Sequence, residues 1–268
     1  MKRKVEIMGI VNLTEDSYFP ESRCGSVGAV LERVSRMLDE GADIIDIGAC
    51  STRPGSLPVG EEEEWRRLSP VLPVLVAEFP SIRISIDTYW SSVVRRTYDL
   101  TGDFIVNDIS AGEDDPMMLT TVGELGLQYV AMHKRGTPLD MQERCDYEDV
   151  VSDVAAYFES FAAKASDAGI TDWILDPGFG FAKTLEQNYE LLGGLGRLCR
   201  SYGGHTPRIL VGVSRKSMIR NLLGISVEDS LPATQAVHMA ALLNGADILR
   251  VHDVKEACQT VCLFNSMP

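Results

Sequence analysis

Short apolar runs alternate with longer amphipathic segments along the whole chain. Eight runs are predicted to be strands: residues 6–11, 43–47, 82–86, 104–106, 128–132, 173–175, 209–213 and 247–251. Three intervening segments, 26–40, 147–168 and 232–243, carry apolar residues at helical spacing and stop at Gly or Asn, the usual helix end. A fourth, 61–79, contains two prolines that predict a break. The near-continuous apolar strands are typical of a parallel sheet covered by helices.

The segments 41–46 and 245–250 repeat one pattern, in which Gly-Ala-Asp closes a helix and apolar residues open a strand. Eight strand–helix units in 268 residues predict an α/β fold, a single-domain TIM (β/α)8 barrel covering residues 1–268. A doubly wound open sheet is the alternative. It is less well supported because the strand count is eight and no GxGxxG follows the first strand.

The charge balance, 25 basic against 39 acidic residues and a net charge of −14, argues against nucleic acid or an anionic membrane as partner. It leaves an anionic small-molecule substrate open. No apolar run approaches the roughly 18 residues of a membrane span, and the N-terminus lacks the pattern of a signal peptide. The six cysteines form no CxxC pair, so reduced thiols and a cytoplasmic location are expected.

Polar side chains stand at the carboxyl end of every predicted strand. In chain order they are Asn12, Asp46, Asp87, Asn107, His133, Asp176, Ser214 with Arg215 and Lys216, and Arg250 with His252. One such residue alone would be a cap or turn former. Eight in a row predict a site, because the strands of a barrel converge on one mouth. The long segments 13–25, 50–60 and 134–146 are expected to be lids or binding loops, with plain surface as the alternative for the third.

Two chemistries are indicated at this mouth. Asp87, Asn107 and Asp176 supply carboxylates and an amide that suit a flat, amidine-like heterocycle such as a pterin or guanine. Asp176 also opens the dense polar and aromatic segment 176–183. Phosphate would be bound by the cationic or potentially cationic side chains Arg53, Lys216, Arg250 and His252. Asn12 is a candidate ligand of Mg²⁺, which prefers oxygen.

Taken together, these residues resemble the dihydropteroate synthase family over nearly the whole chain. The matching segments are 8–14 with Asp16 and Ser17, 41–48 with 51–55, 85–88, 106–110, 132–133, 176–183, 212–217 and 250–254. Each is weak alone, but eight in this order and spacing are specific. The resemblance implies a transferase of folate biosynthesis. It would condense 6-hydroxymethyl-7,8-dihydropterin pyrophosphate with p-aminobenzoate, by an SN1-like loss of pyrophosphate.

The resemblance also implies roles for the matching residues. Catalysis is expected from Asp87, Asp176, Lys216, Arg250 and His252, and pterin binding from Asp87, Asn107, Met132, Asp176 and Lys216. Pyrophosphate binding is expected from Asn12, Arg53, Arg250 and His252, and p-aminobenzoate binding from Thr52, Pro54, Phe181 and Ser217. Asp16 is expected to help loop closure and Asn12 to ligate a Mg²⁺ cofactor. A homodimer that is a sulfonamide target is expected of a family member.

Two positions depart from the family pattern, which usually has Pro where this chain has Glu15 and Glu where it has Cys50. Cys50 is read either as a reactive thiol or as a tolerated small residue. Other functions stay open at this stage. One is a Schiff-base aldolase with Lys183 or Lys216 as nucleophile. Another is a pterin-binding barrel that handles methyltetrahydrofolate or has no catalytic activity.

Overall fold

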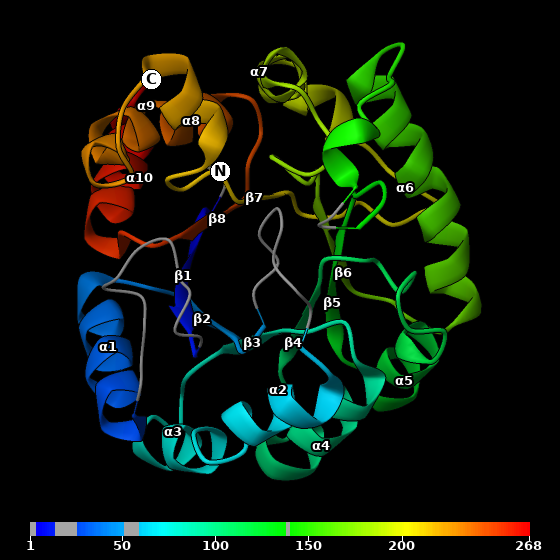
Figure 1. The fold of residues 1–268 in the computed structure, drawn as a ribbon, viewed down its shortest axis with the longest axis vertical. Helices are drawn as coiled ribbons and strands as arrows, with labels where there is room; N and C mark the ends of the chain where they lie inside the picture. The colour runs from blue at the N-terminus through cyan, green and yellow to red at the C-terminus, as the bar shows by residue number, and fades with distance from the viewer. Residues whose placement is uncertain (1–3, 14–25, 51–58, 138–139) are drawn as a thin grey trace.

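The computed structural model describes residues 4–13, 26–50, 59–137 and 140–268. Within them, eight parallel strands form one sheet in the order β6-β5-β4-β3-β2-β1-β8-β7 (Figure 1). They are β1 (Glu6–Asn12), β2 (Ile44–Gly48), β3 (Ile84–Asp87), β4 (Ile105–Asp108), β5 (Gln128–Met132), β6 (Trp173–Asp176), β7 (Leu210–Val211) and β8 (Ile248–Val251). A parallel bridge between Leu175 and Ile209 joins β6 to β7. The barrel is therefore nearly closed, and the predicted TIM barrel is confirmed.

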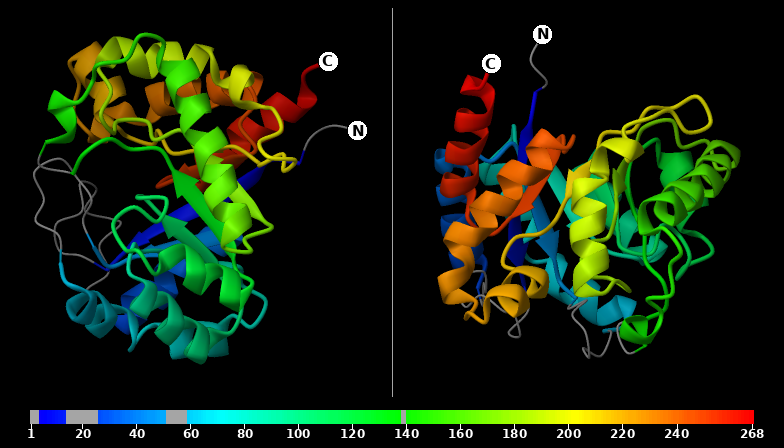
Figure 2. Two further views of the ribbon diagram at one scale, coloured as in Figure 1. Left: turned by 90° about the vertical axis from the view of Figure 1, so that its right-hand side faces the viewer. Right: turned by 90° about the horizontal axis from the view of Figure 1, so that it is seen from above.

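Helices surround this barrel on its outside (Figure 1). They are α1 (Val27–Glu40), α2 (Glu61–Leu68), α3 (Leu72–Glu78), α4 (Ser91–Thr101), α5 (Met118–Leu125), α6 (Val150–Asp167), α7 (Leu185–Gly193), α8 (Ser217–Leu223), α9 (Leu231–Leu243) and α10 (Val254–Ser266). The segment with two prolines divides into α2 and α3, as predicted. The last helix, α10, lies beside β1 and α1, so the last element packs against the first strand and the first helix (Figure 2). No helix in the described ranges is long and apolar enough to cross a membrane.

The inside of the barrel is built in layers, because alternate residues of each strand face inward. One buried layer is apolar and consists of Met8, Ile44, Ile105, Val130, Ile174, Leu210 and Ile248. Two residues further along β2, β4, β6 and β8, the same inward positions carry Asp46, Asn107, Asp176 and Arg250. The apolar layer is therefore a floor, and the polar side chains stand on it at the carboxyl ends of the strands.

Strand β7 is shorter than the predicted run 209–213. After Val211 the chain turns, and the backbone N–H of Lys216 donates to the carbonyl of Val213. Arg215 takes a left-handed backbone conformation in this turn, with φ of 56°. The tight turn brings Ser214, Arg215 and Lys216 to the mouth instead of continuing the strand.

Candidate active site

Arg250 connects four strand ends at the mouth. From the inner face of β8, its Nε donates to Asp46 Oδ2 at 2.7 Å and its Nη2 to Asp87 Oδ2 at 2.8 Å. Asn107 donates to both oxygens of Asp46, at 3.3 and 3.2 Å. Asp46 is fully buried, and its carboxylate orients both Arg250 and Asn107.

Asp46 had no assigned role in the sequence-based prediction, although a signal for it was present. In the repeated segments 41–46 and 245–250, Asp46 and Arg250 occupy equivalent positions. Both lie on the inner face, and they pair across β1, the strand between them.

Two carboxyl groups at the mouth, those of Asp87 and Asp176, are difficult to ionise. Burial raises the pKa of Asp87 to about 7; Arg250 opposes this shift, while the charges of Asp46 and Asp108 add to it. Burial also raises the pKa of Asp176, although the charge of Lys216 and the hydrogen bond from the N–H of Gly178 both act to lower it. These acids therefore favour a ligand that offers positive charge or hydrogen-bond donors.

The loop from β6 to α7 is held by its own side chains. Asp176 Oδ1 accepts from the N–H of Gly178 at 2.8 Å, and Asn188 Oδ1 accepts from the N–H of Gly180 at 2.7 Å. The ammonium of Lys183 donates to the carbonyls of Gly178 and Phe181, at 2.9 and 3.1 Å. Lys183 and Asn188 thus fix the loop that carries Asp176, a role that the sequence-based prediction missed.

Glycine is required at position 178 of this loop. Its φ is 71°, and a Cβ there would lie 1.9 Å from the carbonyl oxygen of His133. His133 itself is 2 % exposed, with Nδ1 lying 3.1 Å from the Lys183 ammonium. The position of His133 at a strand end had suggested that it lines the mouth. Instead it is buried and supports the β6–α7 loop through its contact with Lys183.

Lys216 reaches from the β7 side to this same loop. Its ammonium donates to the carbonyl of Phe179 at 2.5 Å and lies 5.0 Å from the centre of the Phe181 ring. Burial lowers the pKa of Lys216 to about 8 and that of Lys183 to about 7. Lowered lysine pKa values are also what the aldolase hypothesis requires. Both ammonium groups here donate to backbone carbonyls, however, so each lysine has a structural role in holding the mouth together.

An apolar wall completes this half of the site. Met132 at the end of β5 belongs to a buried cluster with Cys50, Tyr89 and Ile109, and Phe181 packs against it. Cys50 is nearly buried, and its Sγ lies 4.0 Å from the Tyr89 hydroxyl. Burial raises the pKa of the Cys50 thiol, so we expect it to behave as a small apolar residue and not as a reactive thiolate.

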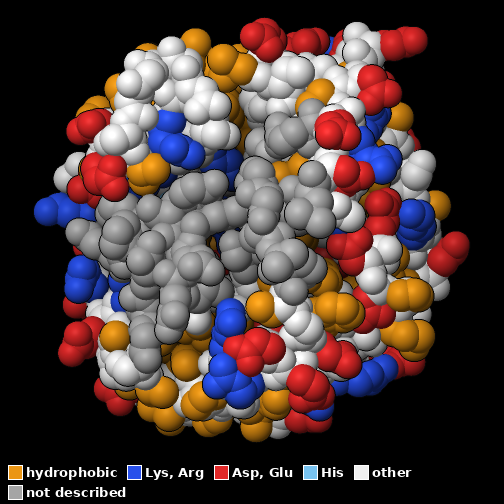
Figure 3. Space-filling view, in the orientation of Figure 1, with side chains coloured by type: hydrophobic (Ala, Val, Ile, Leu, Met, Phe, Trp, Pro, Cys, Tyr) orange, Lys and Arg blue, Asp and Glu red, His pale blue; other side chains and the backbone are white. Residues whose placement is uncertain are grey.

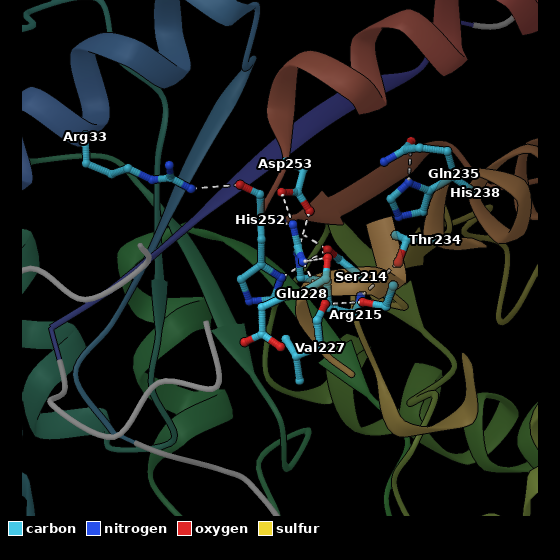
Figure 4. A network of polar contacts seen from close by, with 11 residues as sticks. Arg33, Ser214, Arg215, Val227, Glu228, Thr234, Gln235, His238, His252 and Asp253 are labelled. Atoms are coloured by element: carbon cyan, nitrogen blue, oxygen red, sulfur yellow. Dashed lines mark hydrogen bonds and ion pairs between the residues drawn. The ribbon is translucent and has the colours of Figure 1, made fainter. Parts of the chain in front are cut away.

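His252 follows β8 and does not carry the charge that the sequence suggested. Burial lowers its pKa to about 3, Arg250, Arg215 and Arg33 add to the shift, and Asp253 opposes it. Its ring is therefore neutral at physiological pH. Figure 4 shows the polar network around it.

Asn12, the last residue of β1, lies close to Asp87. A point beside Gly48, where a Cβ would stand, lies 3.4 Å from Asn12 Oδ1 and 3.6 Å from Asp87 Oδ2. Because Gly48 has no side chain, the side-chain oxygens of Asn12 and Asp87 border the same space beside it. Within the described ranges, no three His, Cys, Asp or Glu side chains are grouped to hold a metal ion. A cation there would depend on Asn12 oxygen, water and ligand oxygens, which fits Mg²⁺.

Several predicted residues lie outside the described ranges: Glu15, Asp16, Thr52, Arg53 and Pro54. Most of the two predicted binding loops 13–25 and 50–60 lies there too. Ser217 is described; it begins α8 and is exposed. Acidic side chains are spread along much of the rim of this face (Figure 3), in keeping with the net charge of −14.

Known proteins resemble this chain in both sequence and fold. Residues 8–252 match the family model described as pterin binding enzyme. The dihydropteroate synthase of Escherichia coli K12 is 39 % identical over 257 residues, which cover 95 % of this chain and 89 % of that protein. The Yersinia pestis dihydropteroate synthase in a sulfonamide drug complex has a TM-score of 0.90 and 35 % identity, covering 98 % of this chain and 93 % of that one. The Burkholderia cenocepacia enzyme complexed with 7,8-dihydropteroate has a TM-score of 0.86 and 34 % identity, covering 98 % and 91 %.

Proposed function

The chain belongs to the family of pterin-binding enzymes, and from that membership we propose that it acts as a dihydropteroate synthase. This transferase of folate biosynthesis joins 6-hydroxymethyl-7,8-dihydropterin pyrophosphate to p-aminobenzoate, and the products are 7,8-dihydropteroate and pyrophosphate. The observation that carries the proposal is the ring of buried and half-buried polar groups on the barrel floor. In it, Asp46, Asp87, Asn107 and Arg250 form one network beside Asp176.

The pterin would occupy this ring. Asp176 would accept hydrogen bonds from the donor edge of the heterocycle, and Asn107 and Lys216 would meet its other polar atoms. Met132, in the apolar wall, would cover a face of the flat ring. Asp87 would lie close to the pterin and favour positive charge on it. The raised pKa values of Asp87 and Asp176 support this assignment, because donors from a ligand would compensate both groups for their burial.

The pyrophosphate would lie towards Arg250, His252, Asn12 and Arg53. Arg250 can bind phosphate oxygens in two-pronged fashion, and His252 would act as a neutral donor. Asn12 would contribute a protein ligand to Mg²⁺ carried by the pyrophosphate. When bound, this ion would neutralise charge that gathers on the leaving group.

The reaction would begin with cleavage of the bond between the pterin CH₂ carbon and the pyrophosphate oxygen, in an SN1-like step. Both electrons leave with the oxygen, and the positive charge on carbon spreads into the pterin. Asp87 and Asp176 would stabilise that charge. One preorganised group of this kind is worth about 3–4 kcal/mol in other enzymes. The amine of p-aminobenzoate then attacks the carbon and loses a proton, so no protein nucleophile is needed.

The second substrate would be bound by Phe181, Ser217, Thr52 and Pro54, and Asp16 would help to close the site. Phe181 suits this role because the Lys183 and Lys216 contacts hold it at the mouth. The Yersinia pestis relative is described with a sulfonamide drug, and we propose that sulfonamides bind this chain in place of p-aminobenzoate.

We further propose that residues 1–268 fold as one domain, that the enzyme is a homodimer, as the family resemblance implies, and that it acts in the cytoplasm. Five cysteines in the described ranges, Cys50, Cys145, Cys199, Cys258 and Cys262, are free thiols. Free thiols of this number are usual where thiols are kept reduced.

The test is release of pyrophosphate from dihydropterin pyrophosphate with Mg²⁺, measured with and without p-aminobenzoate. Release that depends on p-aminobenzoate, yields dihydropteroate and is lost in Arg250→Ala supports the synthase. Tight pterin binding without release, even at high p-aminobenzoate, would instead indicate a pterin-binding barrel without this activity.

A further inference from the structure

Ser214 makes two contacts with one residue, His252. The backbone N–H of His252 donates to Ser214 Oγ at 3.2 Å, and the imidazole Nδ1 lies 3.0 Å from the same oxygen (Figure 4). Ser214 follows β7 and is only 5 % exposed. The position of this hydroxyl therefore bears on which nitrogen of His252 carries the proton.

The hydroxyl of Ser214 has one hydrogen to donate and accepts through its lone pairs. The backbone N–H of His252 uses it as an acceptor. If Nδ1 also donated to it, the hydroxyl hydrogen would be buried with no acceptor among the residues that the structure describes, which costs about 1–3 kcal/mol. If the hydroxyl instead donates to Nδ1, both donors that meet at Ser214, its own O–H and the backbone N–H of His252, are satisfied. Nδ1 then carries no proton, and in the neutral ring the proton lies on Nε2.

The surrounding charges favour this neutral ring. Arg215 forms a bidentate ion pair with Asp253, with Nε to Oδ2 at 2.8 Å and Nη2 to Oδ1 at 2.7 Å. The carboxylate adjoining His252 in sequence is therefore already paired. Arg33 donates to the backbone carbonyl of His252 at 2.7 Å, and Arg250 also disfavours a positive imidazole.

We propose that Ser214 is a positioning residue that fixes His252 in its neutral Nε2–H tautomer. The ring then presents an N–H donor on the side away from Ser214, and it binds the leaving pyrophosphate without contributing a positive charge. This proposal rests on the assignment of His252 to the pyrophosphate subsite. It adds a residue to that assignment and specifies the chemical form of the imidazole.

The direct test is ¹⁵N NMR of the imidazole nitrogens in histidine-labelled protein at neutral pH. The chain has four histidines, and comparison with His252→Gln assigns the signals of His252. The expected result is an unprotonated Nδ1 and a protonated Nε2. A proton on Nδ1, or on both nitrogens, would overturn the proposal whether or not the protein has synthase activity. Conversely, absence of synthase activity with the expected tautomer would count against the proposed function alone.

Variants of Ser214 extend the test to catalysis. Ser214→Ala should lower the population of the Nε2–H tautomer and reduce kcat/KM for dihydropterin pyrophosphate by about threefold to tenfold, the effect of one hydrogen bond. Ser214→Thr keeps the hydroxyl, so the Nε2–H population and kcat/KM should both stay close to those of the wild type. The matched control is Thr234→Val, which removes the hydroxyl bonded to the backbone N–H of Arg215 in the same network and should leave the His252 signals unchanged. An unchanged tautomer in folded Ser214→Ala would contradict the proposal.

Discussion

Both ends of the barrel contain buried carboxylates that pair with arginine, but their electrostatic states are opposite. At the amino-terminal end, Glu6 is 7 % exposed and accepts from Arg83 at 2.7 Å and Arg208 at 2.5 Å. Burial alone would raise its pKa, yet these two arginines hold the pKa of Glu6 below its usual value. At the mouth, burial raises the pKa of Asp87 to about 7 and lowers that of Lys216 to about 8.

The difference separates stability from binding. Glu6 is fully compensated by its partners, and such a cluster can only hold the strands in place. At the mouth, burial disfavours the charged forms of both Asp87 and Lys216. A ligand that supplies hydrogen-bond donors and acceptors therefore gains more binding free energy at the mouth than at the amino-terminal end. This division agrees with the general rule for TIM barrels, whose chemistry lies at the carboxyl ends of the strands.

The largest expected contrast is between Arg250→Ala and Arg208→Ala. Arg250→Ala leaves Asp46 and Asp87 buried without their cation, which should cost about 3–5 kcal/mol of unfolding free energy and abolish pyrophosphate release. Arg208 is partly exposed and Glu6 keeps Arg83, so Arg208→Ala should cost about 1 kcal/mol or less and leave activity intact. Urea denaturation and the release assay measure both. Equal losses of unfolding free energy and of pyrophosphate release in the two variants would show that the two ends of the barrel do not differ in function.

The pH dependence of stability should also differ in sign between the ends. Burial raises the pKa of Glu64, a fully buried residue of α2, to about 8, and the charge of Asp87 adds to this. The folded state then binds more protons than the unfolded state between about pH 4.5 and 8. The stabilisation relative to Glu64→Gln should therefore fall as pH rises through that window, by on the order of 5 kcal/mol.

Glu6 has a lowered pKa, so the reverse holds. Its contribution relative to Glu6→Gln should be complete above the unfolded pKa and be lost as pH falls through the folded pKa. Denaturation of the wild type and both variants from about pH 2 to about pH 9 covers both windows and checks the two signs. Parallel pH profiles for the two variants would contradict this assignment.

A smaller effect is expected from Lys183→Met, which removes the donor to the carbonyls of Gly178 and Phe181. Leaving these buried acceptors unpaired should cost about 1–3 kcal/mol and raise KM for p-aminobenzoate through displacement of Phe181. Lys164→Met is the control, because Lys164 is half exposed on α6 and pairs only weakly, at 3.9 Å, with Glu113. If KM for p-aminobenzoate is the same in both variants, Lys183 has no role in positioning Phe181.

The smallest effect is expected at Cys50, because its thiol is buried in the apolar wall and its pKa is raised by burial. Cys50→Ser should change kcat by no more than about twofold and cost roughly 1 kcal/mol. Mass spectrometry after mild alkylation at neutral pH should find Cys199 and Cys262, which are exposed, modified before Cys50. Faster modification of Cys50 would show that it is a reactive thiol after all.

The sequence was sufficient to predict the barrel, because strand–helix alternation and the eight polar strand ends are local patterns. It placed Asp87, Asn107, Asp176 and Arg250 at one mouth, and the structure brings them there. The sequence pattern did not predict which side chains contact each other across the barrel. The pairing of Arg250 with Asp46 depends on strand order and inward direction, which sequence spacing does not give.

Two further features depended on three-dimensional packing. The neutral state of His252 follows from its partial burial beside three arginines, whereas its sequence position suggested only a potential cation. The role of Lys183 follows from the folding of the β6–α7 loop back over its ammonium. Neither relation leaves a periodic signal in the chain.

The most direct test of the central claim is calorimetric binding of 6-hydroxymethylpterin to the wild type, Asp176→Asn and Glu6→Gln. If the mouth binds the pterin while the opposite end only stabilises the barrel, Asp176→Asn should raise Kd by about thirtyfold or more. Glu6→Gln should leave Kd within about twofold of the wild type and lower only the unfolding free energy. Equal affinities of Asp176→Asn and the wild type would contradict the account.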